Sequence, residues 1–280
     1  MFVQFSKTID SVIQSAETSP HLTQEEYFPI YDTIEKYVKE KAVVACLVSG
    51  TSALHLALIM AGVTSGDTVL CQSFTFSASA NPIRYQGANP VFIDSEITTW
   101  NMCTIALEDA IKDQIVQGKK PKAIIVVHLY GMPAKIEEIS TIANEYDIIL
   151  IEDAAEALGS AYKGKKCGTF GDFGILSFNG NKIITTSGGG ALVCKNEESK
   201  KRAIYLATQA RDVAAHFQHS EVGYNYRMSN VLAGIGRGQM EVLDKHIGLR
   251  RANQQFYKKI FSEVPGVTVF EEPNTAYFSN

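Results

Sequence analysis

The sequence contains no long hydrophobic run and no block of basic residues, and each absence excludes a class of protein. The longest purely apolar stretch, Ala42 to Val48, is far shorter than the roughly 20 residues that a membrane-spanning helix needs. With 26 basic and 30 acidic residues the net charge is −4, so neither nucleic acid nor a membrane is expected as a main partner. The segment around Phe5 and Lys7 lacks the features of a secretory signal, which favours a cytoplasmic protein.

Cysteine is also scarce, and its pattern indicates neither a disulfide framework nor a zinc site. The number of cysteines is odd, the gaps between them are wide, and no C-x-x-C pair occurs. We expect reduced thiols that pack in the interior. They are Cys46, Cys71, Cys103, Cys167 and Cys194.

Short apolar runs alternate with amphipathic stretches from Val43 onward, and this alternation predicts an α/β fold. Strands that are apolar on both faces and separated by helices imply a mainly parallel sheet covered by helices on both sides. The predicted strands are residues 42–48, 67–72, 90–94, 122–127, 148–151, 173–178 and 190–194. The predicted helices are residues 53–61, 77–85, 107–116, 136–145, 198–208 and 229–261.

The first predicted strand leads into a helix N-terminus that is suited to bind an anion. Ser49, Gly50, Thr51 and Ser52 place small side chains and free backbone N–H groups there. The alternative is an ordinary helix cap, since Ser and Thr are preferred at this position in any protein.

Two acids follow the predicted strand at residues 148–151. Ligands of open α/β sheets gather at the carboxyl ends of strands, so Asp153 is a candidate site residue. Strand alternation points Glu152 to the opposite face, and the two acids are therefore not expected to act as a pair. A helix cap and a metal ligand are the alternatives for Asp153, although no His or third acid follows at a ligand spacing.

Lys182 follows another predicted strand and has no charged neighbours in the sequence. A lysine in a desolvated site has a lowered pKa and can attack a carbonyl group as a nucleophile. The alternative is a lysine that extends to solvent from a strand end. The glycines at 188–190 allow the backbone to approach a ligand closely, or else form a hairpin turn.

Together these features match the requirements of pyridoxal 5′-phosphate (PLP). Its aldehyde forms a Schiff base with a lysine such as Lys182, and its pyridinium nitrogen needs a carboxylate such as that of Asp153. Its phosphate suits the helix N-terminus at Thr51 and Ser52. An aromatic residue usually covers the ring, and Phe76 is our candidate, with Phe74 or a role in core packing as the alternatives.

Longer motifs in the chain resemble those of the DegT/StrS family of sugar-nucleotide aminotransferases. They extend from about Tyr27 to about Phe261 and include SGTSALHLAL, SFTFSASANPIRYQGANPVFID, HLYGMP, IEDAAEALGS, GTFGDFGILSFNGNKIITTSGGG and GYNYRMSN. The resemblance implies a fold-type I PLP-dependent enzyme.

The resemblance also implies roles for individual residues. Lys182 corresponds to the lysine that bonds to the cofactor, Asp153 to the partner of the pyridine nitrogen, and Phe76 to the ring that stacks on it. Glu156 falls where a family residue touches the phenolic oxygen. The other implied cofactor contacts are Gly50, Thr51, Ser52, Ser177 and Asn179 around the phosphate, and Asn225, which reaches the phosphate of the neighbouring subunit in a homodimer.

The activity that the resemblance implies is transamination in two half-reactions. Glutamate gives up its amine and leaves as 2-oxoglutarate, with Lys182 as general base and acid, and a keto sugar linked to a nucleotide then accepts the amine. A lysine at this position distinguishes the chain from family members that carry histidine there and catalyse dehydration. The variants SFNGNKIITTSGGG, TQARD and GYNYRMSN are most similar to enzymes that aminate UDP-4-keto-6-deoxy hexoses for bacterial surface glycans.

We expect a large PLP-binding α/β domain over residues 1–245, which includes an N-terminal segment, and the start of a small C-terminal domain over residues 246–280. Family members continue well past the position of Asn280. The alternative function is therefore a truncated relative that binds PLP with impaired catalysis. A PLP-dependent regulator would need a nucleic-acid-binding segment with a basic face, which the sequence does not contain.

Overall fold

The computed structural model describes residues 29–38 and 42–280. The segment around Lys7, on which the argument against a secretory signal rests, lies outside these ranges, as does most of the N-terminal segment of the expected large domain. Within the described ranges, no helix is both long enough and apolar enough to cross a membrane.

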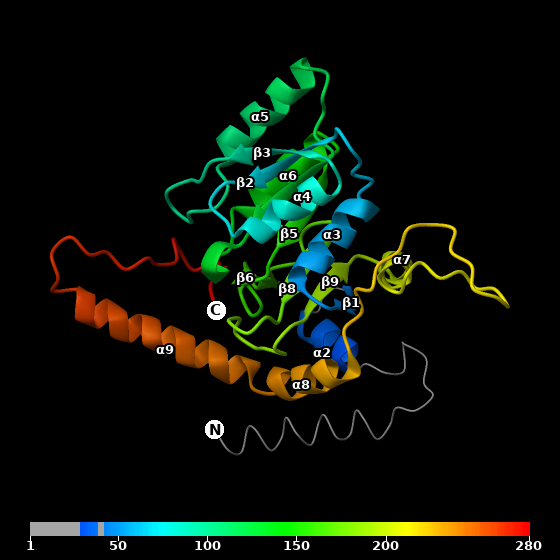
Figure 1. Ribbon diagram of the computed structural model, residues 1–280. Coiled ribbons are helices and arrows are strands. Elements are labelled where there is room, and N and C mark those ends of the chain that lie inside the picture. The colour runs from blue at the N-terminus through cyan, green and yellow to red at the C-terminus, as the bar shows by residue number, and fades with distance from the viewer. Residues whose placement is uncertain (1–28, 39–41) are drawn as a thin grey trace.

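A seven-stranded sheet forms the centre of the protein (Figure 1). Its strands follow the order β1-β9-β8-β5-β4-β2-β3, and β9 alone runs opposite to its neighbours. The strands are β1 (Val43–Leu47), β2 (Thr68–Gln72), β3 (Asn89–Ile93), β4 (Ala123–Val127), β5 (Ile149–Asp153), β8 (Phe173–Ser177) and β9 (Gly190–Cys194). The mainly parallel sheet confirms the predicted α/β class.

Helices cover both faces of the sheet. One face packs against α3 (Gly50–Met60), α4 (Asn81–Tyr85) and α7 (Glu197–Ala207). The other face packs against α5 (Thr104–Val116) and α6 (Ile136–Glu145) at one end, and against α2 (Pro29–Val38), α8 (Asn230–Met240) and the start of α9 (Leu243–Phe261) at the other. The remaining elements are the short helices η1 (Ser77–Ser79) and η2 (Leu129–Gly131) and a small sheet of β6 (Ala161–Tyr162), β7 (Lys165–Lys166) and β10 (Tyr277–Phe278).

Strand β1 shows how the apolar runs build this arrangement. Val44 and Cys46 point into the core under α2 and α8, whereas Ala45 and Leu47 point into the core under α3. A strand covered by helices on both sides needs apolar residues at consecutive positions, which explains the unbroken run in the sequence. The five cysteines are free thiols, and all of them except Cys103 are buried.

Two predicted helices are interrupted in the structure. The predicted helix over residues 229–261 breaks at Glu241 and Val242, and Met240 and Leu243 on the two sides of the break pack into the same core cluster. The predicted helix over residues 77–85 divides at Ala80 into η1 and α4. The periodicity of the apolar residues continues across both breaks and does not reveal them.

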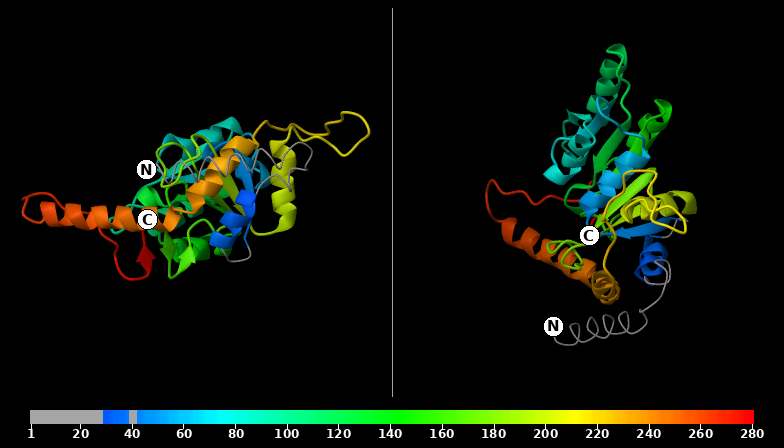
Figure 2. Two further views of the ribbon diagram at one scale, coloured as in Figure 1. Left: turned by 90° about the horizontal axis from the view of Figure 1, so that it is seen from below. Right: turned by 45° about the vertical axis from the view of Figure 1, so that its right-hand side comes forward.

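The chain after α8 leaves the sheet and then returns to it. Figures 1 and 2 show α9 extending away from the body of the protein and the final segment turning back toward the sheet. That return lets β10 pair with β6. Because α9 runs without a break through residues 245 and 246, the expected domain division stays a prediction.

Candidate active site

A cavity of about 480 Å³ lies at the edge of the sheet where β1, β5 and β8 end. The loops after these strands, the loops after β2 and β4, and the segment that leads into β9 supply its lining. The cavity brings together eight of the predicted site residues, which are Gly50, Thr51, Phe76, Asp153, Glu156, Ser177, Asn179 and Lys182.

Lys182 points into this cavity rather than into solvent. Its side chain is only 15% exposed, and Nζ donates a hydrogen bond to Oε1 of Glu156 at 3.2 Å. The other carboxylate oxygen of Glu156 accepts from the backbone N–H of Tyr130 at 2.9 Å. The amine therefore has a fixed position and one acidic partner, as a nucleophile or a proton-transfer group requires.

Asp153 lies at the end of β5 and is buried in the cavity wall. Its Oδ2 accepts from the hydroxyl of Ser79 at 2.6 Å and its Oδ1 accepts from the backbone N–H of Ala155 at 3.2 Å. Burial raises the pKa of the Asp153 carboxyl, and these two hydrogen bonds and Lys182 oppose that rise. A cationic group placed beside this carboxylate would be strongly stabilised.

The N-terminus of α3 forms another part of the cavity wall. Ser49 is the cap, because its side chain accepts the backbone N–H of Ser52 at 3.0 Å. Gly50 and Thr51, the first two residues of α3, line the cavity. A Cβ atom at Gly50 would lie 3.1 Å from the Cβ atom of Ser177, so glycine is what lets the helix start come this close to the end of β8.

The two phenylalanines of the loop after β2 differ in their surroundings. Phe74 stacks with Trp100 at a ring distance of 6.4 Å and meets Tyr130 edge to face at 6.3 Å. Phe76 also lines the cavity, but 79% of it is exposed. Phe76 therefore has a ring that is available to a ligand, which disagrees with a role in core packing.

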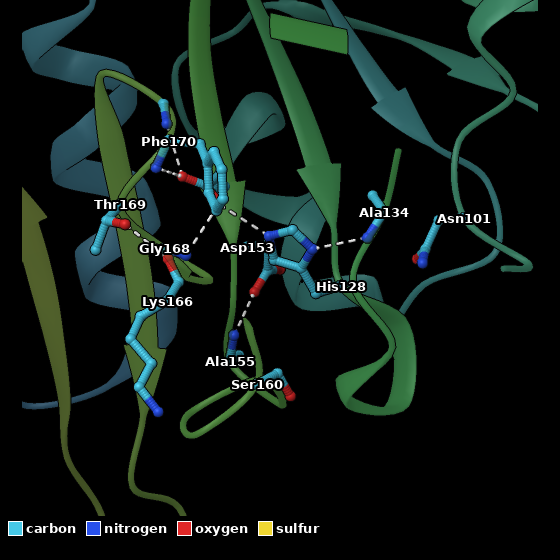
Figure 3. Close-up of polar contacts among 12 residues, drawn as sticks. Asn101, His128, Ala134, Asp153, Ala155, Ser160, Lys166, Gly168, Thr169 and Phe170 are labelled. Atoms are coloured by element: carbon cyan, nitrogen blue, oxygen red, sulfur yellow. Dashed lines mark hydrogen bonds and ion pairs between the residues drawn. The ribbon is translucent and has the colours of Figure 1, made fainter. Parts of the chain in front are cut away.

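Behind the cavity wall, Glu152 belongs to a buried polar cluster of the opposite face, as strand alternation predicts. Figure 3 shows its partners His128, Gly168 and Phe170. Its Oε1 accepts from the N–H groups of Phe170 and Gly171, and its Oε2 accepts from the N–H of Gly168 and from Nε2 of His128. All four donors lie within 2.9 Å of a carboxylate oxygen.

The protonation state of His128 follows from its other nitrogen. The backbone N–H of Ala134 donates to Nδ1 at 3.0 Å, so Nδ1 is an acceptor and the proton is on Nε2. The ring is therefore neutral and its hydrogen donates to Glu152. This cluster holds the ends of β4 and β5 against the loop at residues 168–171.

Two predicted site residues lie outside the cavity lining. The hydroxyl of Ser52 is 2.8 Å from that of Ser49, and both Ser52 hydrogen bonds stay within the helix cap. Asn225 is exposed and forms an isolated bridge with Thr208. Neither residue lines the cavity formed by the described part of the chain.

The structure adds site residues that the sequence interpretation did not name. Tyr130 lines the cavity after β4 and holds Glu156, Ser79 holds Asp153, and Asn181 lies beside Lys182. The rule that ligands gather at the carboxyl ends of strands could have found Tyr130, which follows β4 by three residues. Ser79 has no such signal, because only the fold brings it to Asp153.

The fold and this arrangement of lysine, aspartate and helix N-terminus define the class of fold-type I PLP-dependent transferases. The chain belongs to the DegT/DnrJ/EryC1/StrS aminotransferase family, whose family model matches residues 7–278.

Curated relatives extend beyond this chain in length. EpsN of Bacillus subtilis (strain 168), described as a candidate pyridoxal phosphate-dependent aminotransferase, is 52% identical over 247 residues, which are 87% of this chain and 64% of EpsN. GDP-perosamine synthase of Escherichia coli O157:H7 is 44% identical over 75% of this chain and 56% of its own length. UDP-4-amino-4,6-dideoxy-N-acetyl-beta-L-altrosamine transaminase of Campylobacter jejuni is 38% identical over 78% of this chain and 58% of its own length. The chain thus spans less than two thirds of each relative.

Solved structures share the fold over nearly all of the chain. A DegT DnrJ EryC1 StrS aminotransferase from Brucella abortus superposes with a TM-score of 0.85 at 27% identity and covers 95% of this chain and 72% of its own. The PLP form of Spr1654 from Streptococcus pneumoniae, a candidate sugar aminotransferase, superposes with a TM-score of 0.82 at 26% identity, over 92% of this chain and 69% of its own.

Proposed function

We propose that this chain is a PLP-dependent aminotransferase that moves the amino group of glutamate to a keto sugar linked to a nucleotide. The observation that carries the proposal is the placement of Lys182, Asp153 and the N-terminus of α3 around one cavity. Membership of an aminotransferase family supports it.

The residues of the cavity fit PLP in shape and charge. The N–H groups at the start of α3 and the Ser177 hydroxyl suit the phosphate, and the lack of a side chain at Gly50 leaves room between them. The buried carboxylate of Asp153 suits a protonated ring nitrogen, and the exposed ring of Phe76 suits the face of the cofactor. When bound, PLP supplies an electrophilic carbon for an amine and a ring that withdraws electrons from the reacting carbon.

The side chains of the cavity then have separate tasks. Lys182 Nζ removes the proton from the α-carbon of glutamate, and in the second half-reaction it returns a proton to the sugar carbon that becomes the amine carbon. Glu156 accepts a hydrogen bond from Nζ and keeps it at the reacting carbon, while Tyr130 N–H holds the Glu156 carboxylate. Glutamate loses its amine and leaves as 2-oxoglutarate.

For the acceptor we propose a UDP-linked 4-keto-6-deoxy hexose, used for bacterial surface glycans. The C. jejuni relative is named for a UDP-linked 4-amino-4,6-dideoxy sugar, and the E. coli relative is named for a GDP-linked one. Pocket contacts outside the shared motifs set this choice, so an assay with matched UDP and GDP substrates is its direct test.

We also propose a cytoplasmic homodimer with shared active sites. Asn225 is exposed and does not line the cavity of its own chain, which leaves its side chain available to the cofactor phosphate of a second copy. Chromatography with light scattering, with and without PLP, measures the oligomeric state.

The decisive experiment is a single-turnover spectrum. PLP-loaded protein is mixed with glutamate, and the visible absorption of the bound cofactor is expected to convert to that of its amine form. Conversion in the wild type but not in Lys182→Ala supports the proposal. Normal PLP binding without conversion would contradict the aminotransferase activity and favour a cofactor-binding relative that lacks turnover.

A further inference from the structure

A buried amide side chain lies beneath the turn that follows β4. Asn101 is fully buried, and both polar atoms of its side chain form hydrogen bonds. Its Oδ1 accepts from the backbone N–H of Leu129 at 2.9 Å, and its Nδ2 donates to the carbonyl of Met132 at 2.9 Å and to that of Thr99 at 3.3 Å. Because one side of the amide faces an N–H group and the other faces two carbonyl groups, a single orientation satisfies all three partners.

These hydrogen bonds hold the turn on both sides of Tyr130. Leu129 precedes Tyr130 and Met132 follows it by two residues. Tyr130 itself has a φ of 53°, in the left-handed region that residues with a side chain rarely adopt. Such a conformation persists only where the surrounding structure fixes it. The direction of the Tyr130 N–H group therefore depends on the Asn101 amide.

The Tyr130 N–H group leads directly to the amine of the cavity. It donates to Oε2 of Glu156 at 2.9 Å, and Oε1 of the same carboxylate accepts from Nζ of Lys182 at 3.2 Å. A side chain that is held by hydrogen bonds from a second layer of residues keeps its geometry only while that layer stays in place. A shift of the turn would therefore move Glu156 and, with it, the hydrogen-bond partner of Nζ.

A second buried amide connects Asn101 to another wall of the cavity. Gln72, the last residue of β2, donates from Nε2 to Oδ1 of Asn101 at 3.3 Å and to the carbonyl of Phe74 at 2.9 Å. Its Oε1 accepts from the backbone N–H of Met102 at 2.9 Å. Phe74 lines the cavity in the same loop as Phe76. The amide pair thus fixes the loop after β2 relative to the turn after β4.

We propose that Asn101 is a positioning residue for Lys182, an inference that rests on the proposed function. By holding the turn that presents the Tyr130 N–H group to Glu156, Asn101 keeps Nζ where it must form a bond and move a proton. A misplacement of about 1 Å caused by a distant substitution can slow a reaction about a hundredfold. We expect an effect on rate and not on affinity, because the groups suited to the phosphate and ring nitrogen lie on α3, β5 and β8.

The test separates bond formation from binding. When PLP is added to cofactor-free protein, Nζ of Lys182 bonds to the aldehyde carbon and the aldehyde oxygen leaves as water, which produces the visible absorption. Asn101→Ala should slow this reaction about tenfold to a hundredfold. Pyridoxamine 5′-phosphate has no aldehyde with which Lys182 can bond, and its Kd, measured by calorimetry, should stay at the wild-type value.

Two further variants control for lost stability. Gln114 is a buried amide of α5 that accepts a hydrogen bond from the hydroxyl of Thr68 at 3.3 Å, and neither residue lines the cavity formed by the described part of the chain. Gln114→Ala should lower the thermal midpoint and leave the rate of bond formation unchanged. Asn101→Ser keeps a polar group in place of the amide, should give an intermediate rate, and provides the measurement if Asn101→Ala does not fold.

Kinetics with glutamate complete the test, and Asn101→Ala should lower kcat with little change in the KM for glutamate. Equal rates of bond formation in wild type and Asn101→Ala would overturn the proposal, as would an equal slowing in Gln114→Ala. Weaker binding of pyridoxamine 5′-phosphate with an unchanged rate would also overturn it. Slower bond formation in Asn101→Ala, in a protein whose wild type does not convert glutamate, would instead uphold the positioning role and contradict the aminotransferase activity.

Discussion

Two consecutive acids at the end of β5 serve two different regions of the molecule. Glu152 belongs to the sealed cluster, which comprises Glu152, His128 and the loop at residues 168–171, and its two oxygens accept four hydrogen bonds. Asp153 belongs to the cavity, accepts two hydrogen bonds and keeps its remaining lone pairs available to a ligand. Strand alternation alone separates a carboxylate that holds the fold from one that is available for chemistry.

The comparison also shows what makes a buried acid structural. Three of the four donors to Glu152 are backbone N–H groups that have no freedom to reorient. The fourth, on His128, is fixed because Ala134 occupies the other ring nitrogen. The donors around Asp153 include a serine hydroxyl, which can rotate and serve as donor or acceptor.

The largest effect is expected at the cavity, from Lys182→Ala. Activity should fall by about 10⁴-fold, the upper end of what a proton-transfer group contributes. The thermal midpoint should change little, because Glu156, the partner left behind, is one third exposed. Lys195→Ala removes a lysine from an exposed ion pair with Asp172 and is the matched control, with activity expected at the wild-type level.

In the sealed cluster, Glu152→Gln should destabilise the fold. The amide NH₂ would face two fixed donors, and each group left without an acceptor costs about 1–3 kcal/mol. We expect urea denaturation to show a loss of about 2–6 kcal/mol in the free energy of unfolding. Glu221→Gln, on an exposed bidentate pair with Arg202, should change the free energy of unfolding far less, because solvent screens that pair. Equal stability of Glu152→Gln and wild type would remove the distinction between the two regions.

Substitution of the neighbouring acid, Asp153, should change the free energy of unfolding in the opposite direction. Because burial raises the pKa of Asp153, its ionisation opposes folding, and Asp153→Asn should be more stable than wild type at neutral pH. The two proteins should be equally stable below the ordinary aspartate pKa of 3.8, where the carboxyl is protonated in both states, and should diverge as the pH rises through the raised value. Turnover should nevertheless fall severely, since an unprotonated cofactor ring is a poor electron sink. Thermal melts from pH 3 to 8 measure the first effect, and a stability gap that closes with rising pH would contradict it.

The smallest effect is expected from Phe76→Leu. Loss of one ring contact of about 0.5–1.5 kcal/mol should raise the Kd for PLP about twofold to tenfold in a titration of cofactor-free protein. The thermal midpoint should not change, because the side chain is exposed. Phe74→Leu should show the opposite pattern, with a lower midpoint from lost packing against Trp100 and Tyr130.

Much of the fold follows from local pattern, and the exceptions have physical causes. The helix over residues 136–145 forms as predicted, and the apolar runs become strands. The reversed direction of β9 and its place between β1 and β8 depend on long-range pairing, which periodicity does not encode. Helix α2, whose apolar face packs on α8 and β1, was not predicted.

The candidate site likewise contains some residues that the local sequence pattern can select and others that only the fold brings together. Asp153, Lys182 and the start of α3 could be selected because each follows a strand, and parallel strands end at one edge of the sheet. Ser79 lies in the short helix η1 and reaches Asp153 only because the fold brings the loop after β2 to the end of β5. Tyr130 has a φ of 53°, a backbone state that follows from the turn and not from its residue type.

The pairing of β1 with β9 has a consequence for protein synthesis. β1 leads directly into the start of α3, whereas β9 follows Lys182 and leaves the ribosome much later. Until β9 emerges, β1 has no neighbour in the sheet, and the helix start has no fixed place opposite Asp153. We therefore expect nascent chains to acquire affinity for the cofactor only after Cys194 has cleared the exit tunnel, at one of the last steps in the assembly of the sheet.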